Sequence, residues 1–262
     1  GETPIQDTAS EFGLGSRTGI PLPGENAGRL PTPQARREAY EARPDLFATG
    51  DWRSGDNINM SIGQGDVLVT PLQLVSSYST FANGGTRFRP QIVSKVTRSL
   101  DATLPPGEDG NFEVLRTVEP EQLAKVELDP SHYAKLWQGF VGVTQSAYGT
   151  AAAAWNTNPT AWPMAGKTGT AQVNRKADTA LFVGWGPAVA NVEPAYTVAV
   201  VVPEAGFGSD VAAPVAFRVL RPASEGQVPV ACTVAEQAAC DAAADAAFRQ
   251  SLADSAARGE VE

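Results

Sequence analysis

Residues 166–202 read GKTGTAQVNRKADTALFVGWGPAVANVEPAYTVAVVV, and this stretch decides the fold that the sequence predicts. Three runs within it, at 167–173, 179–185 and 195–202, are rich in threonine, valine and aromatic residues. Such side chains favour strands, and turn residues such as Gly186-Pro187 separate the runs. Because the connections are short, we expect three antiparallel strands in a meander.

The sequence before these strands carries the start and stop signals of a helix at 70–82. Thr70 is placed to cap the N-terminus, Pro71 occupies the first helical position, and Gln73 completes a capping box. Apolar residues follow at helical spacing, and Asn83-Gly84-Gly85 is expected to end the helix.

Two further helices are expected to cover the sheet. One begins at Asp129-Pro130 and has a broad apolar face. That face consists of Tyr133, Leu136, Trp137, Phe140 and Val143. The other has an apolar stripe at i, i+3, i+4 and i+7 that we expect to pack on the sheet. The stripe consists of Ala212, Val215, Ala216 and Val219. Helices on an antiparallel sheet predict an α+β fold.

Composition divides the chain into three parts, and no internal repeat indicates a solenoid. Residues 1–65 are rich in glycine, proline and charge, and are expected to form a loop-rich groove wall. Residues 66–222 hold the core helices and strands, with an exposed turn-rich connection at 104–110. Residues 223–262 are an alanine-rich acidic extension, expected to form one or two loosely docked helices; an acidic interaction tail is the alternative.

The overall charge and the chain ends exclude some classes of protein. In the 262 residues, 20 lysines and arginines face 29 aspartates and glutamates, a net charge of −9, so nucleic acid is not an expected partner. No apolar run is long enough to span a bilayer. Gly1 does not begin a signal peptide, so we expect either a removed leader or a longer chain. Cys232 and Cys240 fit a local disulfide outside the cytoplasm or two independent side chains.

Lys167-Thr168-Gly169-Thr170 is the segment with the most chemical content. A strand that borders a groove can pair with an extended peptide, and a lysine there can attract a carboxylate or lower the pKa of a nucleophile. Thr168 and Thr170 point to one face and can share a carboxylate, while Gly169 leaves room for a neighbouring element. The N–H of Thr170 is suited to an oxyanion. An ordinary strand with an exposed lysine is the alternative.

A series of short blocks spans residues 12–220. These are FGLG at 12–15, TGIPLPGE at 18–25, SIGQG at 61–65, VTPLQ at 69–73, ANGG at 82–85, YGTA at 148–151, KTGTAQ at 167–172, FVG at 182–184, GFG at 206–208 and AAP at 212–214. Together they resemble the C-terminal portion of the transpeptidase domain of class B penicillin-binding proteins, the elongation-type enzymes that cross-link peptidoglycan. Lys-Thr-Gly is one of the three motifs of that family.

This resemblance implies the serine β-lactamase and penicillin-binding transpeptidase fold, in which the strand of Lys167 to Gln172 lines the active groove. It implies catalytic roles for Lys167, Thr168, Gly169 and Thr170. It implies substrate binding by Ala171, Gln172, Gly149 and Thr150, the last two near the groove entrance.

The chain departs from the family pattern in one important respect. No serine has a lysine three positions later or an asparagine two positions later, so the Ser-x-x-Lys and Ser-x-Asn motifs are missing. In the family both motifs come before the FGLG block. We therefore expect that the nucleophile belongs to an upstream half of the same domain, either another chain or a lost segment, and that this chain alone is inactive.

The function implied by the resemblance is a DD-transpeptidase acting on peptidoglycan stem peptides and inhibited by β-lactams, without a cofactor or metal. It implies a location at the extracytoplasmic face of the bacterial membrane and a membrane glycosyltransferase as partner. A DD-carboxypeptidase or β-lactamase of the same fold and a non-catalytic peptide-binding domain are the alternatives.

Other residues carry weaker signals. His132 has no partner at metal-ligand spacing and is expected to be structural. Asp56, Asp66 and Asp178 are isolated carboxylates. Trp137 and Trp185 lie on predicted apolar faces and are expected in the core.

Overall fold

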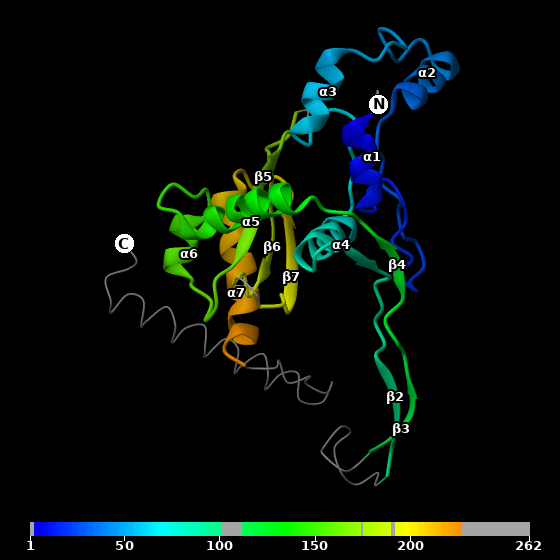
Figure 1. The fold of residues 1–262 in the computed structure, drawn as a ribbon. Coiled ribbons are helices and arrows are strands. Elements are labelled where there is room, and N and C mark those ends of the chain that lie inside the picture. The colour runs from blue at the N-terminus through cyan, green and yellow to red at the C-terminus, as the bar shows by residue number, and fades with distance from the viewer. Residues whose placement is uncertain (1–2, 101–111, 174, 190–191, 227–262) are drawn as a thin grey trace.

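The computed structural model describes residues 3–100, 112–173, 175–189 and 192–226. Figure 1 shows a body in which helices surround a small sheet, with a long two-stranded ribbon extending away from it. The predictions for 104–110, for Cys232 and Cys240, and for the acidic extension beyond residue 226 lie outside the described residues. Among the described residues, no helix has the length and apolar character needed to cross a membrane.

The predicted three-stranded antiparallel meander is confirmed. It consists of β5 (Ala165–Ala171), β6 (Thr179–Gly186) and β7 (Tyr196–Val202), in the order β5-β6-β7. Lys167 lies opposite Val183, and the two neighbouring strand pairs are in continuous register. The first strand begins two residues earlier than predicted and ends at Ala171, so Gln172 lies beyond it.

Helices cover both faces of the sheet, as predicted for an α+β fold (Figure 1). On one face lie α4 (Pro71–Ala82) and α5 (Pro130–Gln145). On the other lie a π-helix, η1 (Gly208–Ala212), and α7 (Ala213–Ser224). The period-2 alternation of β6 serves both layers, because Phe182 packs in one cluster and Trp185 in the other.

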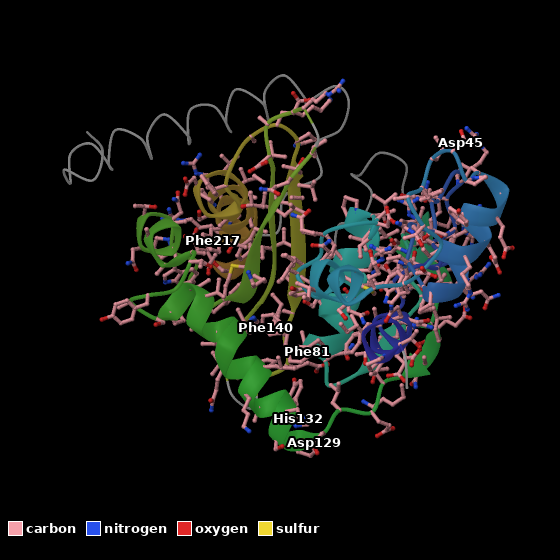
Figure 2. All side chains as sticks on the ribbon, turned by 90° about the horizontal axis from the view of Figure 1, so that it is seen from above. Asp45, Phe81, Asp129, His132, Phe140 and Phe217 are labelled. Carbon is pink, nitrogen blue, oxygen red and sulfur yellow. The ribbon has the colours of Figure 1, made fainter. Side chains whose placement is uncertain are left out.

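An aromatic cluster forms the core between the sheet, α4 and α5. The ring of Trp185, which is fully buried, lies 5.3 Å from those of Phe140 and Trp137 and 5.7 Å from that of Phe81. Figure 2 shows Phe81 and Phe140 on this side and Phe217 on the other. The predicted core placement of Trp185 is confirmed, whereas Trp137 is half-buried and packs against this core from α5. Leu136 was predicted on the apolar face but is 53% exposed, because that face is narrower than the sequence pattern indicated.

The predicted start of α4 is confirmed, with Thr70 and Gln73 forming a reciprocal capping box. The Gln73 side chain is buried and reaches further: its Nε2 donates to the carbonyl oxygens of Ser16, at 2.7 Å, and Ala27, at 2.8 Å. Asn83 ends the helix, and Asp129 caps α5 as predicted. Gln73 thus joins the helix start to the two ends of a preceding loop.

The stripe predicted for the last helix is right for two of its four residues. Ala212 and Ala216 are buried in the core, whereas Val215 and Val219 are 39% and 59% exposed, and Ala213, Phe217 and Leu220 complete the buried face instead. Phe217 packs its ring 5.2 Å from that of Phe182 in β6. The larger apolar side chains Phe217 and Leu220 set the buried face, and the helix continues through Pro222 to Ser224.

Residues 1–65 contain α1 (Pro4–Glu11), α2 (Pro33–Ala42) and α3 (Ser54–Ser61), joined by loops. In the first long loop, the Glu25 carboxylate accepts hydrogen bonds from the backbone N–H of Thr18, at 2.6 Å, and of Gly19, at 3.1 Å. It also accepts one from the Thr18 hydroxyl, at 2.5 Å. A role of this segment as a groove wall stays a prediction.

Between α4 and β5, four strands and one short helix were not predicted. β1 (Thr86–Phe88) pairs with β4 (Gln122–Lys125) beside α4. β2 (Lys95–Ser99) and β3 (Phe112–Thr117) form the protruding ribbon, in which nearly every side chain is exposed. A short helix, α6 (Ala152–Thr157), follows α5.

Candidate active site

The four predicted catalytic residues, Lys167 to Thr170, lie on β5, which pairs with β6 only among the described strands. Its other edge is therefore open to an extended ligand in the described part of the chain. Lys167 is exposed and donates from Nζ to the carbonyl oxygen of Thr168 at 2.7 Å. In the described ranges, no carboxylate forms an ion pair with Lys167. The strand thus presents an uncompensated positive charge beside its free edge.

The turn after α5 brings a second hydroxyl to this strand. Oγ1 of Thr150 lies 2.8 Å from Oγ1 of Thr168, so these two predicted site residues are hydrogen-bonded although 18 positions separate them. Gly149 makes this turn possible, since a Cβ there would lie 2.3 Å from the carbonyl oxygen of Gly142. The two predicted substrate-binding residues therefore sit where the end of α5 meets β5.

Gly169 lies where another element comes close. A Cβ on Gly208, at the start of η1, would lie 2.4 Å from the carbonyl oxygen of Gly169 and 2.1 Å from that of Leu181. Leu181 is the partner of Gly169 in β6. The π-helix therefore packs directly on the backbone of the β5–β6 pair.

Gln64 is a further residue at this edge, and the sequence reasoning did not single it out as a site residue. Its Nε2 donates to the carbonyl oxygen of Thr170 at 3.4 Å, across 106 positions of sequence. Gly63 and Gly65 on either side both have φ of +73°, a left-handed conformation that suits glycine. The SIGQG block was the available signal, but no spacing argument could connect it to β5.

The other predicted residues are not all brought together. Ala171 is half-buried at the end of β5, and Gln172 is exposed beyond it. Nδ1 of His132 lies 3.7 Å from Oδ1 of Asp129. Figure 2 shows both residues at the start of α5, where their side chains are exposed. Asp66 pairs with Arg29 and Arg36, and Asp56 caps α3. These groups have structural partners and do not approach Lys167.

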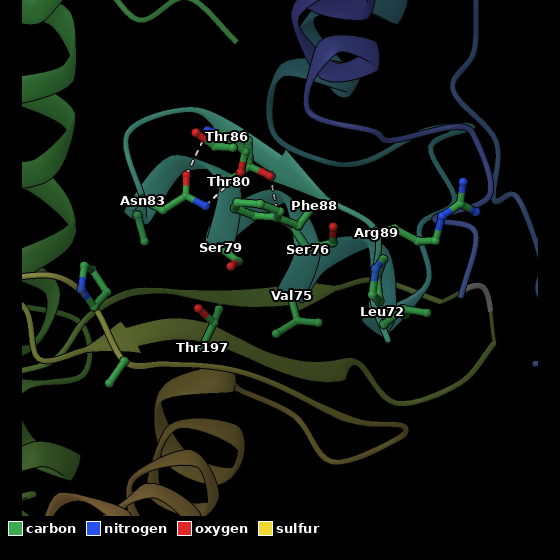
Figure 3. A pocket seen from close by; sticks show the side chains of 14 residues that line it. Leu72, Val75, Ser76, Ser79, Thr80, Asn83, Thr86, Phe88, Arg89 and Thr197 are labelled. Carbon is green, nitrogen blue, oxygen red and sulfur yellow. Dashed lines mark hydrogen bonds between the residues drawn. The ribbon is translucent and has the colours of Figure 1, made fainter. Parts of the chain in front are cut away.

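Two cavities of the described structure differ in whether they adjoin the free edge of β5. One of about 320 Å³ opens between α4, Arg89 and the start of β7, and none of the predicted site residues lines it (Figure 3). The other, of about 210 Å³, lies beside Gln64 and is lined by Trp52, Asn59 and Asp56 among others. Only the second adjoins the free edge of β5, through Gln64.

The arrangement suits the binding of an extended peptide that carries a carboxylate. The free edge supplies backbone donors and acceptors, Lys167 supplies charge, and Thr150 and Thr168 supply hydroxyls. No serine of the 262 residues stands in a Ser-x-x-Lys pattern that would place a base next to it.

Comparison with known proteins gives a consistent result. The family model described as the penicillin binding protein transpeptidase domain matches residues 1–221. Peptidoglycan D,D-transpeptidase MrdA of Haemophilus influenzae is 32% identical over 229 residues, which cover 82% of this chain and 32% of that protein. Penicillin-binding protein 2A of Bacillus subtilis is 36% identical over 165 residues, covering 62% of this chain and 19% of that protein.

Solved structures give the same picture. The crystal structure of Pseudomonas aeruginosa PBP2 in complex with WCK 5153 has a TM-score of 0.66 and 32% identity, covering 84% of this chain and 42% of that chain. A chain of a peptidoglycan synthase complex that coordinates polymerization and crosslinking has a TM-score of 0.64 and 28% identity, covering 88% and 35%. The chain therefore spans less than half the length of these relatives and neighbours.

Proposed function

The chain belongs to the penicillin-binding protein transpeptidase family, and from this premise we propose that it is the C-terminal part of a peptidoglycan D,D-transpeptidase that works through a serine acyl-enzyme. The resemblance to class B, elongation-type members and the expected transpeptidase fold are confirmed by these relatives and structures. The substrates, the mechanism and the roles of individual residues are proposals.

The observation that carries this proposal is the exposed, uncompensated Lys167 on the free edge of β5, next to the hydrogen-bonded Thr150 and Thr168. A stem peptide has an extended backbone and a terminal carboxylate. In our proposal its backbone pairs with β5 while Lys167 and the two hydroxyls bind the carboxylate. The N–H of Thr170 donates to the oxyanion that forms during attack.

The chemistry requires a serine that the 262 residues do not supply in the family motif. We place it in a segment outside this sequence. Its Oγ attacks the carbonyl carbon of the penultimate D-alanine while its proton passes to the motif lysine. The peptide C–N bond then breaks, and that proton is delivered to the nitrogen of the leaving D-alanine. An amine of a second stem peptide then attacks the ester, forms the new amide and returns the serine to its free state. A β-lactam acylates the same serine.

The cellular setting follows from the same proposal. Peptidoglycan lies outside the bacterial membrane, so we place the site at the extracytoplasmic face. One structural neighbour comes from a complex that coordinates polymerization with crosslinking. This supports our proposal that a membrane glycosyltransferase is a partner of the complete protein.

Labelling of the complete protein with a fluorescent penicillin tests this function. We expect the wild type to be labelled and Lys167→Ala to lose about a hundredfold or more in acylation rate, because a charge that orients the ligand is removed. Lys95→Ala, which removes an exposed lysine on the distant ribbon, is the matched control and should label normally. Equal labelling of both variants would refute the role of Lys167.

Two further results would change the assignment. Rapid hydrolysis of penicillin by the complete protein would identify a β-lactamase of the same fold. A complete sequence without Ser-x-x-Lys would instead identify a non-catalytic peptide-binding domain, for which the missing motif in these 262 residues is the supporting observation.

A further inference from the structure

Two carbonyl oxygens of β5, those of Thr168 and Thr170, already have side-chain partners. The carbonyls of Thr168 and Thr170 are two residues apart and so point to the same edge of the strand. Nζ of Lys167 donates to the first at 2.7 Å, and Nε2 of Gln64 donates to the second at 3.4 Å. Among the described strands β5 pairs with β6 alone, and we infer that the two carbonyls engaged by side chains face its unpaired edge.

The hydrogen bond from Gln64 to the Thr170 carbonyl has the properties of one that a ligand can replace. Its length of 3.4 Å is well beyond the usual 2.9–3.0 Å of such a bond, so it is weak. A carboxamide donating to a backbone carbonyl also offers the same group, an amide N–H, that an extended peptide would offer there. Gln64 thus occupies the acceptor that a bound peptide needs at Thr170.

A cavity beside Gln64 offers its side chain an alternative position. It lines the cavity of about 210 Å³ together with Trp52 and Asn59. This volume is many times the ~10–15 Å³ that one water molecule needs, so a carboxamide fits without displacing protein atoms. Neither of the flanking residues, Gly63 and Gly65, has a side chain to obstruct such a movement, and nothing lies within 4 Å of a Cβ at Gly63.

We propose that Gln64 is a positioning residue that holds the Thr170 carbonyl in the free protein and releases it to the amide N–H of an incoming acyl-peptide. A ligand that brings an amide N–H to this point replaces the Gln64 hydrogen bond with its own, whereas a ligand without one leaves Gln64 in place. Gln64 therefore weakens binding of every ligand that uses the Thr170 carbonyl, and it keeps the exposed strand edge paired between turnovers. This inference rests on the proposed function, because it assumes that the substrate pairs with β5.

Acylation kinetics of the complete protein test the proposal, with the non-covalent dissociation constant and the acylation rate constant measured separately. The two probes are a fluorescent penicillin, which carries an acylamino N–H, and a carbapenem, which carries a hydroxyethyl group instead. For Gln64→Ala we expect the dissociation constant of the penicillin to fall roughly two- to fivefold, the effect of removing one weak competing hydrogen bond. The acylation rate constant, the melting temperature and the carbapenem constants should not change.

Gln34→Ala is the matched control, because it removes the exposed side chain of another glutamine in the same N-terminal part of the chain. It should leave all constants unchanged. An unchanged penicillin dissociation constant in Gln64→Ala, or an equal change for both probes, would overturn the inference alone. If Gln64→Ala had a lower melting temperature and bound penicillin more weakly than the wild type, the inference would be overturned, and Gln64 would have only a structural role. A complete wild-type protein that takes no label would overturn the proposed function, and this inference with it.

Discussion

The phenol of Tyr78 is packed between the rings of Phe140, at 5.5 Å, and Trp185, at 6.2 Å. Burial raises the pKa of Tyr78 to about 12, because the phenolate would lose its hydration there. The neutral form is thus favoured in the folded state. Stability from this residue is complete below the ordinary tyrosine pKa of 10 and is lost as pH rises from 10 towards 12.

We predict that Tyr78→Phe reduces the alkaline loss of stability. The wild type should lose roughly 2–3 kcal/mol more unfolding free energy between pH 10 and 12 than the variant, given a shift of about two pKa units. Denaturant unfolding at both pH values measures this difference. An absorbance titration of tyrosinate should show, in the variant, the loss of one phenol that titrates late in the wild type. Parallel pH profiles for the two proteins would contradict the prediction.

The pKa of Glu25 is shifted in the opposite direction from that of Tyr78. The Thr18 hydroxyl foremost, with the N–H groups of Thr18 and Gly19, lowers the pKa of this carboxyl below its ordinary value of 4.5. Its contribution to stability is therefore present above pH 4.5 and is lost as pH falls through the lowered pKa. We predict that Glu25→Gln is less stable than the wild type at pH 7 and that the difference shrinks at pH 3. Urea unfolding at the two pH values measures it, and a constant difference would contradict the prediction.

At the scale of elements, the contact between η1 and the β5–β6 pair depends on the absence of a side chain. A Cβ at Gly208 would lie 2.1 Å from the carbonyl oxygen of Leu181, so something must move. We predict that Gly208→Ala costs about 1–3 kcal/mol of unfolding free energy and weakens penicillin binding by the complete protein, since the Gly169 backbone shifts with it.

Gly139 in the middle of α5 provides the matched control. A Cβ there meets nothing within 4 Å, and helix propensity favours alanine over glycine. Gly139→Ala should raise the unfolding free energy by about 0.5–1 kcal/mol and leave binding unchanged. If both alanine variants behaved alike in thermal unfolding, close packing at Gly208 would be refuted.

Elements with strong local signals could be predicted from the sequence. Thr70, Pro71 and Gln73 fix the start of α4, and the three strand runs predict the meander. The start of α2 carries the same signal, with Thr32 as cap and Pro33 at the first position, although residues 1–65 were read as loops with short elements.

Other elements have no such signal. The spacing of Val215 and Val219 fits a helical stripe as well as that of Phe217 and Leu220, and only the sheet beneath decides between them. The strands of the ribbon have no buried face, so hydrophobic alternation does not mark them. The part of the candidate site on β5 follows from one contiguous motif, whereas Gln64 and Thr150 reach β5 through tertiary structure.

At the scale of the whole molecule, the ribbon of β2 and β3 stands apart from the body, whereas β6 is paired on both sides and covered on both faces (Figure 1). A solitary two-stranded sheet is only marginally stable in water. We predict that amides of β2 and β3 exchange with solvent fastest among the strands and those of β6 slowest. Hydrogen exchange followed by mass spectrometry measures this. Equal protection of the ribbon and of β6 would show that the ribbon is covered.

The loop between Ser16 and Ala27 is closed twice at its base, by the Gln73 amide and by the Glu25 carboxylate. Its tip at residues 21–24 is exposed, and a Cβ at Gly24 would meet nothing within 4 Å. Because both closures lie below the tip, changes in the tip are mechanically separated from α4 and from the sheet. The tip is therefore a place to attach a fluorophore or an affinity handle, so that the protein can be followed or immobilised while the unpaired edge of β5 stays untouched.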